Sequence, residues 1–154
     1  MIIGTVHYRQ NDDEQFRSHW ALFVAPPDID PRNGTVALYQ ILDKRGEDTV
    51  PWYKRHIPSV TPSDSQRFVG CVILEANTGP LWTAQRLDSL LQQIPIPPPP
   101  TRCSTWVCNA IAVLQAQGVL PAETYADSTK VRQRLDARQM QLLNGLIPGG
   151  ITLF

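Results

Sequence analysis

The chain has 154 residues, and its 14 lysines and arginines balance its 14 aspartates and glutamates, so the formal charge is zero. This length suits one compact domain and is too short for two ordinary ones. The absence of a basic cluster argues against a nucleic-acid or anionic-membrane surface and favours a small molecule or a peptide as partner. We expect a single domain over 1–154, with a helical extension from about residue 121. The pattern gives no indication of the oligomeric state.

The cysteines at positions 71, 103 and 108 cannot all pair, and they lack the dense, even usage of a small secreted scaffold. Reduced thiols are therefore expected. The first eight residues contain neither a basic leader nor a signal-length apolar stretch, and no segment approaches the ~20 apolar residues that cross a bilayer. These observations predict a cytoplasmic protein without a membrane span.

Four segments rich in β-branched and aromatic residues predict strands at 2–8, 19–25, 35–42 and 67–74. The second is continuously apolar after its histidine, as in a central strand, and 26–34 is a turn that makes a hairpin with the third. We expect polar turns at 10–14 and 43–48, a short irregular strand at 50–57, and a loop at 58–65. Cys71 is expected to be an inert packing residue in the fourth strand.

Two amphipathic helices are predicted, one over 81–93 and one that begins near Cys103 and stops at Gly118. The proline-rich stretch 94–100 between them favours an extended spacer. The pattern of 126–143 predicts a surface helix, and 151–154 either adds an edge strand or packs against the domain. The expected fold class is α+β, with an antiparallel sheet of four to six strands packed against the first two helices.

Cys103 lies in the first turn of the second helix, at the end of its apolar stripe. Unpaired backbone N–H groups and the helix dipole stabilise a thiolate at such a position, and the thiolate is the nucleophilic form. The alternative is a small apolar side chain that fills a corner of the core. Cys103 and Cys108 are turned about 140° from each other on a helix, so they do not share one metal ion. We predict no metal site and, without a phosphate loop or dinucleotide motif, no cofactor.

Two short motifs resemble a known superfamily. His19-Trp-Ala-Leu-Phe-Val24 and Arg102-Cys-Ser-Thr-Trp-Val107 are similar, in order and spacing, to motifs of the circularly permuted papain-like proteins of the NlpC/P60 superfamily, in its lecithin:retinol acyltransferase/H-rev107-like branch. The match is closer to small fungal proteins with His-Trp-Ala-Leu-x-Val and Asn-Cys-x-x-Trp-Val. The resemblance implies a papain-like fold and a cysteine-dependent hydrolase or acyl/aminoacyl transferase acting on an amide or thioester.

Carried over by motif, the resemblance makes Cys103 the nucleophile and His19 the base, with a backbone N–H of Cys103 or Ser104 stabilising the oxyanion. The acyltransferase branch has a second, orienting histidine where this chain has Leu38. Gln40 shares a strand face with Leu38 and is our candidate for the orienting role, whereas Tyr39 points the other way. The candidate substrate-binding residues are Trp20, Arg102, Ser104, Trp106 and Tyr39.

Arg102 also departs from the resemblance, because it replaces the usual asparagine with a positive charge beside the sulfur. Two other functions therefore stay open: a non-catalytic binding module that kept the fold, and a fungal natural-product tailoring enzyme that catalyses cyclisation or isomerisation. Alternation along the strand places His19, Ala21 and Phe23 on one face and Trp20, Leu22 and Val24 on the other. A hydrogen bond between the Cys103 sulfur and the His19 ring would favour the enzyme, and a wide separation would favour the module.

Overall fold

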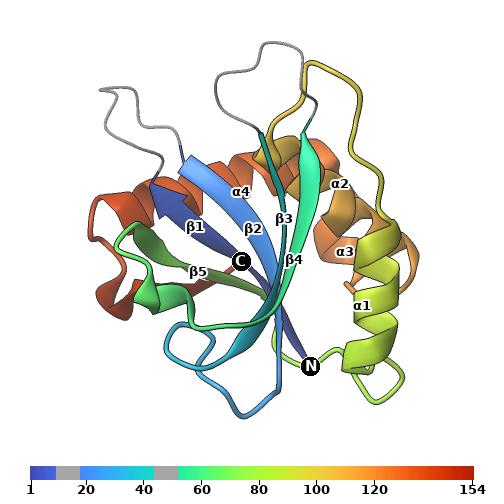
Figure 1. Ribbon diagram of the computed structural model, residues 1–154, viewed down its shortest axis with the longest axis horizontal. Coiled ribbons are helices and arrows are strands. Elements are labelled where there is room, and N and C mark those ends of the chain that lie inside the picture. Colours follow the sequence, from blue (N-terminus) through green and yellow to red (C-terminus); the bar gives the residue numbers. More distant parts are fainter. Residues whose placement is uncertain (10–17, 44–51) are drawn as a thin grey trace.

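The computed structural model describes residues 1–9, 18–43 and 52–154, in which six strands form one sheet (Figure 1). The sheet order is β4-β3-β2-β1-β5-β6, and every neighbouring pair is antiparallel except β5 and β6. The strands are β1 (Ile2–Arg9), β2 (Ser18–Ala25), β3 (Val36–Leu42), β4 (Tyr53–Val60), β5 (Phe68–Glu75) and β6 (Ile151–Leu153). The α+β class and the largely antiparallel sheet are confirmed, and the C-terminal residues add an edge strand.

The helices of the described residues are α1 (Ala84–Gln93), α2 (Cys103–Ala116), α3 (Ala122–Tyr125) and α4 (Ser128–Leu143), and two 3₁₀ turns are η1 (Pro62–Asp64) and η2 (Pro148–Gly150). Helix α1 begins three residues later than the apolar pattern suggests because Thr83 caps it, its hydroxyl accepting from the backbone N–H of Arg86. Asp127 caps α4 in the same way. Within the described ranges, no helix is long and apolar enough to cross a membrane.

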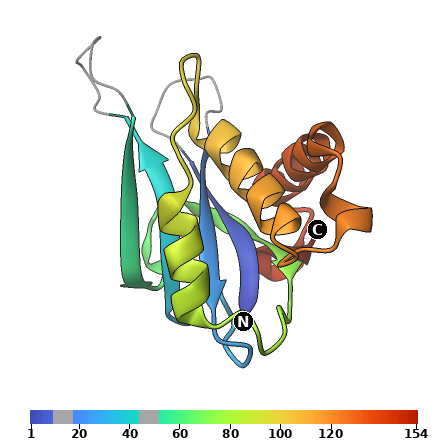
Figure 2. The same cartoon turned by 90° about the vertical axis from the view of Figure 1, so that its right-hand side faces the viewer.

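The helices cover one face of the sheet (Figure 2). Trp20, Leu22 and Val24 of β2 belong to the same buried cluster as the apolar residues of α2, whereas Ala21 and Phe23 belong to a second cluster on the other face. The expected alternation along β2 is therefore confirmed. Helix α4 is the surface helix that the pattern of 126–143 predicts, and its apolar stripe of Val131, Leu135 and Leu142 joins the helix-side cluster.

The other face of the sheet is concave and is crossed by the chain. Strands β4 and β5 are separated by three strands in the sheet order, so residues 61–67, which connect them, run across this face (Figure 1). The 26–34 loop packs against the crossing, where the backbone N–H of Ser63 donates to the carbonyl oxygen of Arg32 at 3.1 Å. The concave face therefore has its own covered core beneath the crossing.

Strand β4 corrects one expectation. It is a regular strand over Tyr53–Val60, not an irregular segment at 50–57 followed by a loop. Pro58 lies inside it because β4 is an edge strand, where a residue without an N–H is tolerated. The turns expected at 10–14 and 43–48 lie outside the described residues except for Asp43.

Candidate functional site

Cys103 lies at the point where the pairing between β2 and β3 ends. The two strands pair only from Leu22 opposite Tyr39 to Val24 opposite Ala37, so within the described residues the first half of β2 is paired with β1 alone. The Cys103 sulfur lies against this edge of β2, on the side that β3 does not pair. It accepts from the backbone N–H of Trp20 at 3.5 Å and lies 3.8 Å from the carbonyl oxygen of Ser18. The thiol thus takes the place of a strand partner.

The environment of Cys103 does not favour the thiolate. Burial raises the pKa of the thiol above its ordinary value. The backbone N–H groups of Trp20, Ser104 and Cys103 and the nearby charge of Arg132 act in the opposite direction but only partly offset the burial. The expected stabilisation by the helix N-terminus is therefore present but outweighed, because the side chain is only 5% exposed.

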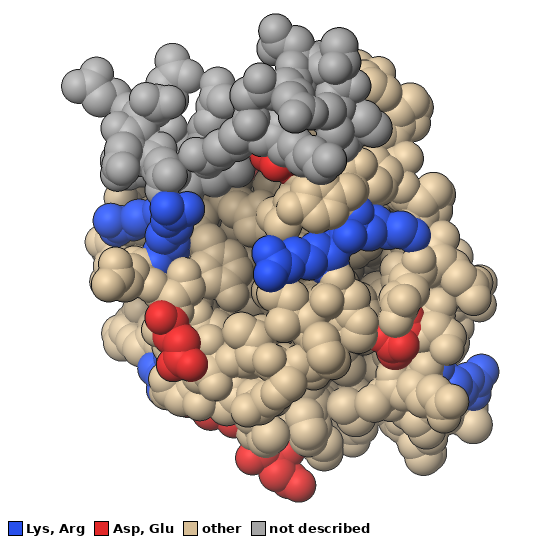
Figure 3. All heavy atoms as spheres, viewed as in Figure 1, with Lys and Arg blue, Asp and Glu red and all other residues tan. Residues whose placement is uncertain are grey.

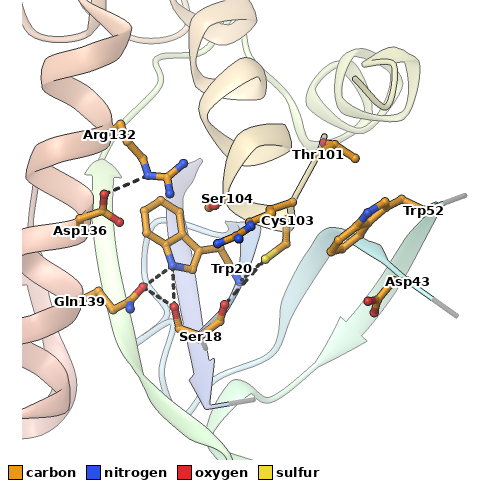
Figure 4. A pocket seen from close by; sticks show the side chains of 11 residues that line it. Ser18, Trp20, Asp43, Trp52, Thr101, Cys103, Ser104, Arg132, Asp136 and Gln139 are labelled. Carbon is orange, nitrogen blue, oxygen red and sulfur yellow. Dashed lines mark hydrogen bonds and ion pairs between the residues drawn. The ribbon is translucent and has the colours of Figure 1, made fainter. Parts of the chain in front are cut away.

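A cavity of about 360 Å³, the thiol cavity, opens beside Cys103. Figure 4 shows α4 side chains on one side of the sulfur, and Trp52 and Asp43 on the other. Arg132 forms an ion pair with Asp136 at 3.0 Å, and its guanidinium carbon lies 5.3 Å from the centre of the Trp20 ring. Arg102 and Ser104, two of the expected substrate-binding residues, line this cavity.

Trp20 also lines the thiol cavity, but it is almost fully buried and mainly structural. Its indole N–H donates to the side-chain oxygens of Gln139 and Ser18, the latter at 3.1 Å, and Ser18 in turn donates to Gln139 at 2.6 Å. This network connects β2 to α4. Gln139 was missed at the sequence level because one polar residue in a polar helix gives no periodic signal.

His19 and Gln40 are brought together as predicted. The Nε2–H of His19 donates to Oε1 of Gln40 at 2.7 Å. Burial lowers the pKa of His19, while the hydrogen bond to Gln40 and the charge of Asp43 raise it. Gln40 is on the face of β3 that carries Leu38, and Tyr39 is on the other, as the alternation predicted.

The expected pairing of Cys103 with His19 is not formed. The thiol cavity is lined by Cys103 and not by His19, and no hydrogen bond joins the two side chains in the described part of the chain. His19 and Gln40 instead line a cavity of about 580 Å³ on the opposite face, the concave cavity. The physical reason is alternation: α2 packs on the Trp20 face of β2, so the neighbouring His19 points to the other face.

Tyr39 and Trp106 line neither of these cavities. Both are buried in the helix-side core and border a third cavity of about 260 Å³ between α1 and strands β3 and β4. The Tyr39 hydroxyl donates to Asp88 of α1 at 2.9 Å, and its ring stacks on His56 with centroids 4.5 Å apart. The candidate residues therefore divide among three cavities around the point where β2 and β3 separate.

Comparison with known proteins places the chain in a family. A family model matches residues 5–121, more than half of the chain and both short motifs. The chain belongs to the family of unknown function DUF6540. The searches of curated proteins and of solved structures gave no match. The DUF6540 match ends before α4, so Arg132, Asp136 and Gln139, which line one side of the thiol cavity, lie outside the matched region.

His7 of β1 is a further residue that the sequence motifs do not single out. It is fully buried on the helix side, its ring 5.0 Å from that of Trp20 and its Nε2 2.9 Å from the Thr5 hydroxyl. Burial lowers its pKa to about 4, although Gln139 beside the ring raises it. His7 does not line the thiol cavity. Within the described residues, no cluster of side chains suited to a metal ion occurs.

Proposed function

We propose that the protein is a non-catalytic, small-molecule binding module. One observation carries the proposal: the thiol of Cys103 and the imidazole of His19 open into different cavities on opposite faces of the sheet. A cysteine hydrolase needs a base within hydrogen-bonding reach of its thiol, or one bridging water away. This arrangement supplies a binding surface without that pair.

The other histidines do not replace His19 as a base. The chain has three histidines, all within the described residues. His7 is sealed in the core and His56 borders the third cavity, so none of the three lines the thiol cavity. Asp136 does line it, but its carboxylate is paired with Arg132. With the thiol bonded to strand backbone as well, the site lacks an activated nucleophile.

We further propose that the architecture is a permuted papain-like one, related to the NlpC/P60 superfamily. Three features support this: a histidine at the start of β2, a polar partner for it on β3, and a cysteine at the first turn of α2. Their order along the chain matches the resemblance that the two motifs carry. On this view the fold was kept while the catalytic pairing was given up.

Alkylation of Cys103 tests the proposal. We expect iodoacetamide to label Cys103 of the folded protein more slowly than free cysteine at pH 7, with a rate that rises only at a pH above the ordinary thiol pKa of about 8.5. His19→Ala should leave the rate unchanged, and His56→Ala is the matched control. Labelling faster than free cysteine at pH 7, lost in His19→Ala, would overturn the module and establish the enzyme.

A cysteine-dependent hydrolase or transferase is the second candidate. The hydrogen bond between His19 and Gln40 favours it, because a base held by an orienting side chain is what such chemistry requires. The sulfur also contacts backbone atoms of Ser18 and Trp20, the two neighbours of His19. The enzyme would need the thiol to leave this backbone position, and the labelling experiment reports whether it does.

A further inference from the structure

We propose that the concave cavity binds a small aromatic carboxylate, with the ring system against the sheet and the carboxylate at the arginine rim. This inference rests on the proposed binding function and names its site and ligand class. The cavity volume of about 580 Å³ lies within the range of small-molecule sites, roughly 300 to 1,000 Å³. Strands β1 to β4 and the 61–67 crossing all contribute side chains to it.

The floor of the concave cavity suits a flat apolar body. Leu38, Ile57 and Val60 supply aliphatic surface from β3 and β4. The Tyr8 ring stacks on the His19 ring, with centroids 6.3 Å apart and an angle of 27° between the planes. Aromatic rings prefer such offset or stacked contacts with another ring, so this lining favours an aromatic ligand over a polar one.

The rim of the concave cavity carries an excess of positive charge. Arg9, Arg55 and Arg67 line it, and Asp43 is the acidic side chain among the described lining residues. Figure 3 shows lysine and arginine side chains on two sides of a hollow on this face of the molecule. A guanidinium group binds a carboxylate through two parallel hydrogen bonds, so the rim complements an anionic end group.

The polar pair in the concave cavity is fixed in place. Gln40 is 7% exposed, and its amide oxygen is occupied by the Nε2–H of His19. Burial keeps His19 uncharged near neutral pH, so the pair adds no positive charge of its own. The arginines at the rim therefore decide the preference for an anion, and the pair orients the His19 ring against the ligand.

An NMR titration of the three histidine Cε1–H signals tests the inference, using 2-naphthoate as the probe and neutral 2-naphthamide as its matched control. We expect 2-naphthoate to shift the His19 signal saturably while the His7 and His56 signals stay in place. Arg55→Ala and Arg67→Ala should each weaken binding about tenfold, the loss of a charge-assisted hydrogen bond. Lys130→Ala removes an exposed charge on α4 and should bind like the unmodified protein.

Equal binding of 2-naphthamide, unchanged affinity in both arginine variants, a shift of His56 instead of His19, or no saturable shift would each overturn the inference. These outcomes are separate from the alkylation of Cys103. Slow Cys103 labelling without a naphthoate response would support the non-catalytic binding module but overturn the proposed aromatic carboxylate ligand. Rapid, His19-dependent labelling of Cys103 would overturn the non-catalytic binding module, whatever the result of the titration.

Discussion

The Cys103 sulfur lies 3.5 Å from the backbone nitrogen of Trp20, on the side of β2 where no β3 residue is paired in the described chain. A buried N–H without an acceptor is costly, so the thiol satisfies a group that a neighbouring strand would otherwise bond. Cys103 therefore has a structural role that does not depend on chemical reactivity.

Replacing Cys103 should separate this structural role from a catalytic one. Cys103→Ala leaves the Trp20 N–H without its acceptor and should lower the free energy of unfolding by about 1–3 kcal/mol. Cys103→Ser retains an acceptor and should cost less than about 1 kcal/mol. Urea denaturation measures both. Two variants of equal stability would mean that the sulfur does not support the strand.

Acid should destabilise the protein through His7. The pKa of His7 is lowered to about 4 in the folded state, against about 6.5 in the unfolded chain. Between these values the unfolded chain binds more protons, so the free energy of unfolding decreases as the pH is lowered. The expected loss is about 2 kcal/mol between pH 7 and pH 5. Urea midpoints across this range measure it. In His7→Gln this part of the slope should disappear, and a slope identical to that of the unmodified protein would refute the assignment.

The contact between β3 and α1 depends on Tyr39. Its hydroxyl donates to Asp88, so Tyr39→Phe should lower the free energy of unfolding by about 1 kcal/mol. Tyr53, which is exposed on the neighbouring strand, provides the matched control, and Tyr53→Phe should be neutral. Thermal unfolding compares the two. An unchanged melting temperature for Tyr39→Phe would leave this residue available for the substrate-binding role expected from the sequence.

Gly4 is required by close packing within the sheet. A Cβ atom at this position would lie 2.5 Å from the carbonyl oxygen of Val72 and from the Phe23 ring. Gly4→Ala should therefore cost more than about 2 kcal/mol, because backbone must move. At Gly79 a Cβ meets nothing within 4 Å, and only its positive φ of 77° opposes a side chain. Gly79→Ala should cost about 1 kcal/mol, and equal losses for both variants would contradict the packing argument.

The sheet could be predicted from the sequence because strands such as 19–25 carry continuous apolar patterns, and alternation assigned the two faces of β2 and β3 correctly. Gln40 as the partner of His19 followed from the same rule. What the sequence could not supply was which of the two faces α2 covers, since both faces of β2 are apolar. The placement of Cys103 relative to His19 depended on that choice.

Because side chains alternate along β2 and β3, consecutive residues of either strand point to opposite faces of the sheet. Position 19 reports on the concave cavity and position 20 on the thiol cavity. Tyr39 borders the third cavity, and Gln40 lines both the concave and the third cavity. Adjacent substitutions therefore form natural control pairs for these compartments. In a family of unknown function, sequence variation confined to alternate positions of β2 and β3 would show which face of the sheet evolution has conserved and which it has changed.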